Sequence, residues 1–287
     1  MNYNVLIVGS GPVGVSLAAN LSSNGLEVYL QSREGLVKDA VGYRQFEKSW
    51  VYDVKLKHPK SYDIAFICTK AYDIESAIKS HKEVLLKSSR IVFMTNGYTK
   101  MLVNKSRSLL PGISFEFGVT DRAVVKNSVF QFEAKSRLGS YYWSSGELLD
   151  IEKYLMSENP DLFRITKDHD LFLRKKWILN VVINSITAAH LYKKNGSINV
   201  SSKEFSDVFA EAFSLSEKLF PNTDFDKRET FKSLLDLIEA TKDNFNSMAY
   251  DRSLGRETES EFLAGISLEY DNYPTLAFMH KKISGLL

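Results

Sequence analysis

The sequence predicts an α/β domain built on a doubly wound sheet, followed by a domain that consists of helices only. Residues 5–8 form a short apolar run, rich in β-branched side chains, that ends in a glycine-rich turn and continues as a helix. Residues 63–69 and 90–95 are two more apolar runs of strand length. Towards the middle of the chain the strand pattern stops, and one helix pattern follows another. We therefore expect an N-terminal domain over residues 1–166 and a helical domain over residues 167–287.

The turn after the first strand has the sequence Gly9-Ser10-Gly11-Pro12-Val13-Gly14, which is a GxGxxG spacing. In a dinucleotide-binding domain the first glycine permits the tight turn, the second lets a pyrophosphate approach the backbone, and the third lets the helix pack closely on the strand. The helix then presents unpaired N–H groups to the phosphates. We expect all six residues to bind a dinucleotide in a Rossmann-type site, although an ordinary glycine-rich turn can have the same composition.

The second strand, at residues 27–30, ends where an Asp or Glu normally binds the ribose 2′-hydroxyl of NAD. This chain has Gln31-Ser32-Arg33 at that place. Because a guanidinium can bind a 2′-phosphate, Arg33 favours NADP over NAD as the cofactor. Glu34 would weaken this preference if its side chain pointed inward.

Two polar residues directly follow the predicted buried strands. Lys70 comes after the strand at residues 63–69, and Asn96 comes after the strand at residues 90–95. Ligands of a doubly wound sheet gather at the carboxyl ends of its strands, so both residues are candidates for cofactor contact, and Asn96 for substrate contact as well. A solvated loop lysine and a plain Asn-Gly turn are the alternatives.

The remaining patterns complete the two domains. Residues 113–142 alternate as strands do, and we expect them to finish the sheet as antiparallel pairs. A polar helix over about residues 147–156 precedes the turn signal Asn159-Pro160. Helices are then expected over residues 168–191, 203–219, 228–250, 257–268 and 274–286.

The helix at residues 168–191 is apolar on nearly every side, except for one polar row. Lys176, Asn180 and Asn184 are spaced by four and therefore lie along one face. Such groups need polar partners inside an apolar helix, because each unsatisfied group costs about 1–3 kcal/mol. The row therefore lines a polar cavity, or Lys176 reaches solvent while the two Asn side chains cap neighbouring backbone.

A second polar cluster lies nearer the end of the sequence. Ser247 and Asp251 are four residues apart on one predicted helix face, and Glu259 begins the next element. Taken alone, this cluster is also typical of an exposed and capped helix end.

The composition disfavours several classes of function. The formal net charge is +2, from 37 Lys and Arg against 35 Asp and Glu, which indicates neither a nucleic-acid nor a membrane partner. No apolar run approaches the roughly 18–20 residues that span a bilayer, so we expect a soluble protein. Cys68, the only cysteine, lies in an apolar run and is expected to be a buried hydrophobe rather than a reactive thiol. We expect no disulfide and no metal site, and a reducing cytoplasm fits.

Taken together, the motifs resemble those of the ketopantoate reductase (2-dehydropantoate 2-reductase) family. GSGPVG, TKAYD, TNGY, KKWILNVVINSITA and NSMAYDRSLGRETE occur in the order and approximate spacing of that family, from residue 5 to about residue 265. The resemblance implies a Rossmann-type domain and a helical domain like the C-terminal domain of 6-phosphogluconate dehydrogenase. It also implies NADPH-dependent reduction of 2-dehydropantoate to pantoate, on the route to pantothenate and coenzyme A.

The resemblance also implies roles for individual residues. Lys176 would be the catalytic lysine, and Glu259 would be the active-site glutamate that also reaches the cofactor. The implied substrate-binding residues are Asn96, Asn180, Asn184 and Ser247, and the implied cofactor-binding residues outside the glycine turn are Arg33, Lys70 and Asn96.

Two departures from the family pattern leave questions open. Asn195 resembles the asparagine of a family Asn-Gly pair, but its spacing is offset by one. The segment over residues 265–283 is shorter than the usual family ending, which could change the wall of the substrate pocket or a dimer surface.

Three functions are therefore compared. The first is reduction of 2-dehydropantoate, and the second is a related dehydrogenase reaction on another 2-keto or 3-hydroxy acid. The third is a regulator that binds NADP(H) without turnover, which the retention of the polar residues at 176, 180, 184, 247 and 259 argues against. The sequence leaves the oligomeric state open, with a homodimer among the alternatives.

Overall fold

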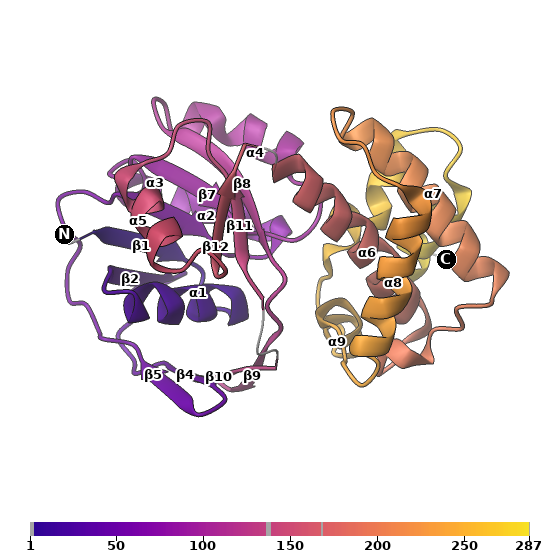
Figure 1. The fold of residues 1–287 in the computed structure, drawn as a ribbon, viewed down its shortest axis with the longest axis horizontal. Helices are drawn as coiled ribbons and strands as arrows, with labels where there is room; N and C mark the ends of the chain where they lie inside the picture. The colour runs from indigo at the N-terminus through magenta and orange to yellow at the C-terminus, as the bar shows by residue number, and fades with distance from the viewer. Residues whose placement is uncertain (1–2, 136–138, 168, 287) are drawn as a thin grey trace. The chain divides into compact units, whose positions relative to one another are not determined.

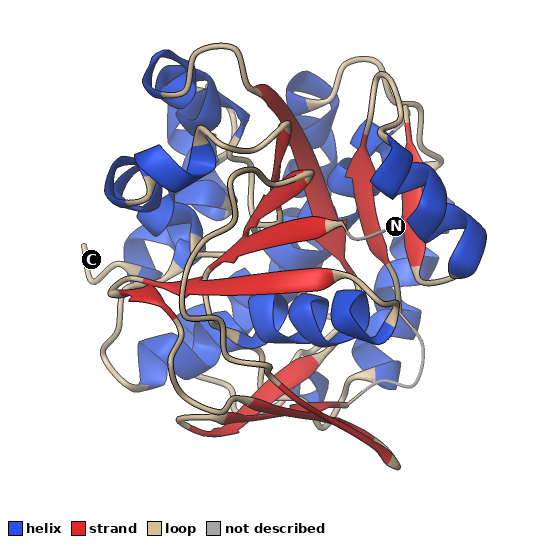
Figure 2. Cartoon of the chain, turned by 90° about the vertical axis from the view of Figure 1, so that its left-hand side faces the viewer, coloured by secondary structure: helices blue, strands red, loops and turns tan. Residues whose placement is uncertain are grey.

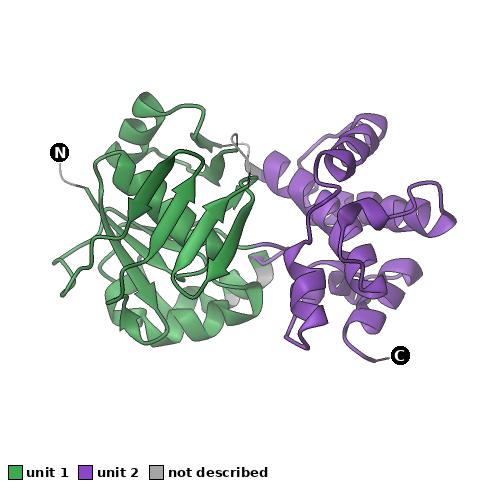
Figure 3. Cartoon of the chain, turned by 90° about the horizontal axis from the view of Figure 1, so that it is seen from below, with its two compact units in different colours: residues 1–95, 100–169 green, residues 96–99, 170–287 purple. Residues whose placement is uncertain are grey.

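The computed structural model describes residues 3–135, 139–167 and 169–286. It divides the chain into two compact units, which Figure 3 shows in different colours. The first unit comprises residues 1–95 and 100–169, and the second comprises residues 96–99 and 170–287. The short segment 96–99 thus groups with the helical unit, although it directly follows a strand of the first.

Among its described residues, the first unit contains an eight-stranded sheet in the order β12-β11-β8-β7-β6-β1-β2-β3. Figures 1 and 2 show this sheet in two views. Strands β1, β2, β6, β7 and β8 are paired in parallel, β11 runs antiparallel to β8 and parallel to β12, and β3 runs antiparallel to β2. The strand bounds are β1 Asn4–Val8, β2 Glu27–Ser32, β3 Gly35–Leu36, β6 Ile64–Ile67, β7 Arg90–Phe93, β8 Ser114–Thr120, β11 Tyr141–Ser144 and β12 Phe163–Thr166. Since the chain goes from β1 outward to β2 and then returns to β6 on the other side, the sheet reverses its strand order at β1 and β6.

Helices cover both faces of this sheet because the strands are apolar on both faces. Helices α1 (Pro12–Ser23) and α5 (Asp150–Glu158) pack on the face that presents Val5 and Ile7. The opposite face, which presents Leu6 and Val8, packs against α2 (Ile74–Ser80), α3 (Lys82–Leu85) and α4 (Lys100–Ser106). The two faces therefore define a doubly wound α/β unit, as the sequence predicted.

A separate four-stranded sheet in the order β5-β4-β10-β9 corrects part of the prediction for residues 113–142. Its strands are β4 Gly42–Gln45, β5 Lys48–Val51, β9 Val124–Ser128 and β10 Gln131–Ala134. Phe132 and Ala134 of β10 belong to the same apolar cluster as α1. β9 and β10 therefore do not extend the main sheet, and β8 joins β7 in parallel rather than antiparallel.

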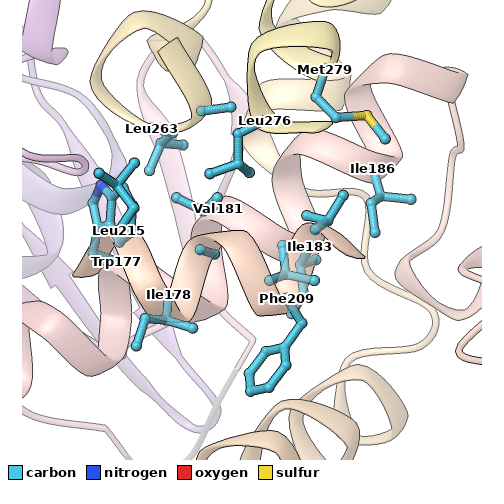
Figure 4. Packing of buried hydrophobic residues seen from close by; sticks show 14 of the residues in the cluster. Trp177, Ile178, Val181, Ile183, Ile186, Phe209, Leu215, Leu263, Leu276 and Met279 are labelled. Atoms are coloured by element: carbon cyan, nitrogen blue, oxygen red, sulfur yellow. The ribbon is translucent and has the colours of Figure 1, made fainter. Parts of the chain in front are cut away.

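The second unit is built around α6 (His169–His190), whose apolar side chains Trp177, Ile178, Val181, Ile183 and Ile186 lie in one buried cluster (Figure 4). Helix α7 (Lys203–Leu219) contributes Phe209 and Leu215 to that cluster, and α10 (Pro274–Ile283) contributes Leu276 and Met279. This arrangement explains why α6 is apolar on nearly all sides.

Two of the expected helices are interrupted. The predicted helix at residues 228–250 is instead α8 (Lys227–Ala240) and α9 (Ser247–Ser253), separated by a turn. Asn246 caps α9 by accepting a hydrogen bond from the amide of Ala249 at 3.0 Å. Such a side-chain cap competes with continuation of the helix from α8.

The predicted helix at residues 257–268 is replaced by two 3₁₀ turns, η4 (Glu259–Phe262) and η5 (Ala264–Glu269). The carbonyl of Phe262 accepts hydrogen bonds from Tyr98 N and Trp177 Nε1, so it is not part of a helical ladder. Partners from outside the segment therefore compete with an α-helix here.

The described residues contain no helix that is both long and apolar enough to cross a membrane. The same residues contain no group of three or more His, Cys, Asp or Glu side chains arranged to hold a metal ion.

Candidate functional site

The glycine turn after β1 is fixed by close packing at two of its three glycines. Gly9 has φ +113°, and a Cβ there would lie 2.8 Å from the carbonyl of Cys68. A Cβ on Gly14 would lie 1.9 Å from the carbonyl oxygen of Gly9. Side chains at these positions are therefore excluded by the protein itself, since contacts below about 3 Å require the backbone to move.

Gly11 differs because, apart from its own atoms and those of its two chain neighbours, no described atom lies within 4 Å of the position that its Cβ would take. The protein does not require a glycine here, whereas a pyrophosphate that approaches the backbone would. Pro12 is the first residue of α1, so the start of a 12-residue helix faces the same place. The turn therefore fits a dinucleotide, whose diphosphate would be held by residues 9–14.

The strands on both sides of β1 hold this turn in place. The amide of Gly9 donates to the carbonyl of Gln31 in β2 at 2.8 Å, and the amide of Cys68 donates to Val8 O at 2.7 Å. The Cys68 thiol is buried, which raises its pKa. This burial agrees with the expectation of a small hydrophobe and opposes thiolate formation.

The end of β2 contains no inward carboxylate. The side chain of Gln31 is buried, and its Nε2 lies 3.1 Å from Nδ1 of His81. Arg33 is exposed and binds both carboxylate oxygens of Asp73 through Nη2, each at 2.8 Å. Glu34 is also exposed, and its amide donates to Ser32 Oγ at 3.3 Å. The strand end therefore presents a guanidinium whose partner comes from another loop.

Lys70 lies at the carboxyl end of β6, where it precedes the 3₁₀ turn η1 (Ala71–Asp73). It is half-buried, and its carbonyl accepts a hydrogen bond from the amide of Asp73 at 3.0 Å. Because β1 and β6 are neighbouring parallel strands, this loop emerges at the same sheet edge as the glycine turn. Lys70 therefore lies at the same edge of the sheet as the glycine turn.

In the second unit, the polar row on α6 continues beyond the residues that the spacing predicted. Lys176 and Asn180 are half-buried, and Asn184 is 9% exposed. Three residues further on, Thr187 is fully buried, and its Oγ1 donates to the carbonyl of Ile183 at 2.7 Å. Thr187 Oγ1 also accepts a hydrogen bond from Asn246 Nδ2 at 2.6 Å. The row therefore ends against the residue that caps α9.

This contact determines where Ser247 lies. Asn246 caps α9, so Ser247 is the first residue of that helix and adjoins the contact with Thr187. The Ser247 side chain is exposed, which leaves it accessible to a ligand. The structure thus brings the start of α9 to the C-terminal half of α6.

Asn195 has a structural role in the described part of the chain. It is 5% exposed, its Nδ2 donates to Thr241 Oγ1 at 3.0 Å, and its Oδ1 accepts from Asn246 Nδ2 at 3.0 Å. A Cβ on the next residue, Gly196, would lie 2.9 Å from Lys242 Cβ. The Asn-Gly pair therefore fixes the connection between α8 and α9.

The carbonyl of Phe262 joins three segments that carry predicted site residues. Trp177 Nε1 donates to it at 3.2 Å, and the amide of Tyr98 donates to it at 2.8 Å. Trp177 follows Lys176, Tyr98 lies two residues after Asn96, and Phe262 lies three residues after Glu259. The fold of the second unit therefore brings together the segments of Lys176, Asn96 and Glu259.

Glu259 and Asp251 are both largely buried. Glu259 is 4% exposed and begins η4, which the side chain of Thr258 caps through Ser260 N at 3.4 Å. Asp251 is 9% exposed, and its Oδ1 lies 3.9 Å from Arg256 Nη1. Asp251 therefore faces the connection that leads to η4, and it does not share the exposure of Ser247.

Sequence reasoning assigned no role to four residues that organise this site: Trp177, Thr187, Asn246 and Phe262. Thr187 could have been found, since it continues the polar row three residues after Asn184. Asn246 precedes a short helix and is a common capping residue type. The role of the Phe262 carbonyl could not be predicted from the sequence, because every residue has the same backbone carbonyl.

A doubly wound sheet with this glycine turn, followed by a helical unit with an amine and two amides in one row, is the architecture of a dinucleotide-dependent oxidoreductase. The chain belongs to the ketopantoate reductase PanE/ApbA family. The model of that family matches residues 5–136, and the model of its C-terminal part matches residues 168–270.

Individual relatives agree in fold and differ in activity. The 2-dehydropantoate 2-reductase of Pyrococcus horikoshii is 24% identical over 280 residues, which are 93% of this chain and 90% of the relative. A dimeric ketopantoate reductase from Staphylococcus aureus has a TM-score of 0.79 at 15% identity, over 98% of both chains. D-mandelate dehydrogenase, with NADH and anilino(oxo)acetate bound, has a TM-score of 0.80 at 15% identity, over 98% of this chain and 97% of its own.

Proposed function

We propose that this protein reduces 2-dehydropantoate to pantoate with NADPH, as a step towards pantothenate and coenzyme A. The observation that carries the proposal is the polar row of Lys176, Asn180 and Asn184 on an otherwise apolar helix, in a chain of this family. Lys176 and Asn180 are half-buried and Asn184 is buried, and burying polar groups is unfavourable unless they meet polar partners. A polar ligand explains that pattern.

The two units supply different parts of this reaction. The first unit would hold the dinucleotide through residues 9–14, with Arg33 at the adenosine 2′-phosphate and Lys70 at the neighbouring loop. When bound, the nicotinamide supplies a hydride to the keto carbon of the substrate. The chain binds and orients both reactants, which can lower the barrier by several kcal/mol.

Lys176 has the chemistry that the substrate carbonyl requires. As hydride reaches the keto carbon, the carbonyl oxygen gains negative charge, and a cation or proton donor aimed at that oxygen stabilises the transition state. The ammonium of Lys176 supplies both the charge and the proton that completes the hydroxyl group. Glu259, buried on η4, would orient that ammonium and contact the cofactor.

The uncharged residues would position the substrate. Asn180 and Asn184 can donate to and accept from its keto and hydroxyl groups. Ser247, exposed at the start of α9, would bind the substrate carboxylate. Asn96 would also bind the substrate, from the segment that Tyr98 attaches to Phe262 by a hydrogen bond. We further propose that the protein works as a homodimer, which the dimeric S. aureus relative supports, and that it is located in the cytoplasm.

A second candidate is the reduction of a different 2-keto acid. D-mandelate dehydrogenase shares the fold over nearly the whole chain, so the architecture accepts other hydroxy and keto acids. The residues proposed to act on the keto and carboxylate groups would serve either reaction, because both substrates carry those groups. The two candidates differ in the distal part of the substrate.

The experiment that separates them compares turnover on two substrates. NADPH oxidation is measured with 2-dehydropantoate and with its analogue that lacks the distal hydroxyl, together with a panel of other 2-keto acids. We expect the highest kcat/KM on 2-dehydropantoate. A higher value on another 2-keto acid would support the second candidate, and NADPH binding without turnover of any panel member would contradict both.

A further inference from the structure

The ion pair between Arg33 and Asp73 connects the two loops that flank the glycine turn. Arg33 follows β2 and Asp73 follows β6, and these are the two strands on either side of β1. Because all three strands are parallel, both loops emerge at the sheet edge that also holds the turn. The pair therefore lies where the adenosine part of a dinucleotide enters the crevice.

The end of β2 lacks a carboxylate, whereas the loop after β6 supplies one, Asp73, to the pair. A NAD-binding domain ordinarily has an acid at the end of its second strand, which accepts from the ribose 2′-hydroxyl. Here the side chain of Gln31 is buried, and it forms a hydrogen bond with the ring of His81. Asp73, from the adjacent loop, places both oxygens 2.8 Å from Arg33 Nη2.

A 2′-phosphate and a 2′-hydroxyl make opposite demands on this pair. The phosphate is attracted by Arg33 and repelled by Asp73, whereas the hydroxyl can donate to Asp73. The pair itself is easily opened, because the Arg33 side chain is 84% exposed and such surface pairs contribute little to stability. Opening the pair should therefore change the stability of the fold little.

We propose that Asp73 is a specificity-determining residue. It lowers the affinity for NADPH relative to that for NADH, so that the site also accepts NADH. This inference rests on the proposed function, since it concerns the same cofactor site. Arg33 alone would give a strong preference for the 2′-phosphate form. Asp73 competes with the phosphate for Arg33 and offers the unphosphorylated ribose an acceptor.

Asp73 can be tested by substitution, because its backbone, and not its side chain, makes the contact at the start of α2. Its carbonyl accepts from Ser76 Oγ at 2.9 Å, and within the described residues its side chain does not cap α2. Asn is as good a residue as Asp at the start of a helix, so Asp73→Asn preserves the turn. Glu34→Gln is a matched control, because it removes the same charge from an exposed residue next to Arg33.

The test measures dissociation constants for NADP⁺ and NAD⁺ by isothermal titration calorimetry with the full-length protein. Removing one charge close to the phosphate is expected to tighten NADP⁺ binding about tenfold in Asp73→Asn, while NAD⁺ binding weakens. Arg33→Ala is expected to act oppositely and to weaken NADP⁺ much more than NAD⁺. Glu34→Gln is expected to change the ratio of the two constants much less.

Each outcome bears on the proposal. An unchanged ratio in Asp73→Asn, with both nucleotides still bound, would overturn the inference and leave the proposed reaction intact. An equal effect of Glu34→Gln would overturn it as well, because the cause would then be overall charge. If the wild-type protein bound neither nucleotide, the proposed function would fail, and this inference with it.

Discussion

The indole Nε1 of Trp177 donates a hydrogen bond to the carbonyl of Phe262 at 3.2 Å, across 85 residues of sequence. The same carbonyl accepts from the amide of Tyr98 at 2.8 Å. Trp177 adjoins Lys176 on α6, and Phe262 ends the 3₁₀ turn that Glu259 begins. One backbone acceptor thus fixes the positions of the segments that carry the proposed acid and its partner.

Trp177→Phe tests this contact. The substitution removes the indole donor and part of a ring that is 3% exposed, so we expect a loss of about 1–3 kcal/mol in the free energy of unfolding. kcat should fall, because the turn with Glu259 loses one of its attachments. NADPH affinity should stay unchanged. Calorimetry measures this affinity, and steady-state kinetics measures kcat. Normal kcat in a destabilised variant would show that the contact serves stability alone.

Gly97→Ala tests the attachment of residues 96–99. Gly97 has φ +84°, and a Cβ there would lie 2.6 Å from Phe262 Cβ. Gly112→Ala is the matched control, because Gly112 has φ +78° and its Cβ would have no described atom within 4 Å. We expect a cost of about 1–2 kcal/mol for Gly112→Ala from backbone strain, and roughly 1–3 kcal/mol more for Gly97→Ala from the collision. Thermal unfolding measures both, and equal costs would contradict the role of the contact.

Lys176→Ala tests the proposed general acid. We expect kcat to fall by at least about 100-fold, because neither the charge nor the proton reaches the substrate oxygen. NADPH binding should be retained. Lys175→Ala is the control, since Lys175 is the adjacent residue and is exposed. An active Lys176→Ala protein would exclude this role for the lysine.

Gly11→Ala separates ligand binding from folding at the glycine turn. A Cβ there meets no described atom within 4 Å, so the melting temperature should stay within about 1–2 °C of wild type. Binding of NADPH should weaken strongly, because the methyl group occupies the path of the pyrophosphate. Gly14→Ala should instead destabilise the protein, since its Cβ would lie 1.9 Å from Gly9 O. Undiminished NADPH binding in Gly11→Ala would argue against a dinucleotide in this turn.

Burial lowers the pKa of His81 below its usual value of 6.5, and it lowers those of His58 and His280 as well. As the pH falls, these histidines therefore bind protons more readily in the unfolded chain than in the folded protein. The contribution of these histidines to the free energy of unfolding should be fully present above pH 6.5 and should be lost as the pH falls below that value. His81→Gln, which keeps an amide beside Gln31 but does not titrate, should reduce this dependence. Melting curves from pH 5 to pH 8 measure it, and an unchanged slope in the variant would contradict the contribution of His81.

The sequence by itself determined the class of the fold and the chemistry of the candidate residues. The strand, glycine turn and helix over residues 5–25 could be recognised because each depends on neighbouring residues and on a spacing that backbone geometry imposes. The row on α6 was visible for the same reason, since a helical period of 3.6 places every fourth residue on one face. The roles of these residues stay predictions until the variants are measured.

Only the tertiary structure decided which segments pair. It moved β9 and β10 to a second sheet, broke the helix expected at residues 228–250, and gave Arg33 an acidic partner 40 residues away. It also turned Gln31 inward and joined Trp177, Tyr98 and Phe262 through one carbonyl. Local patterns could not predict these outcomes, because hydrogen bonds between distant segments depend on where the whole chain places a donor and an acceptor, and backbone groups are the same in every residue.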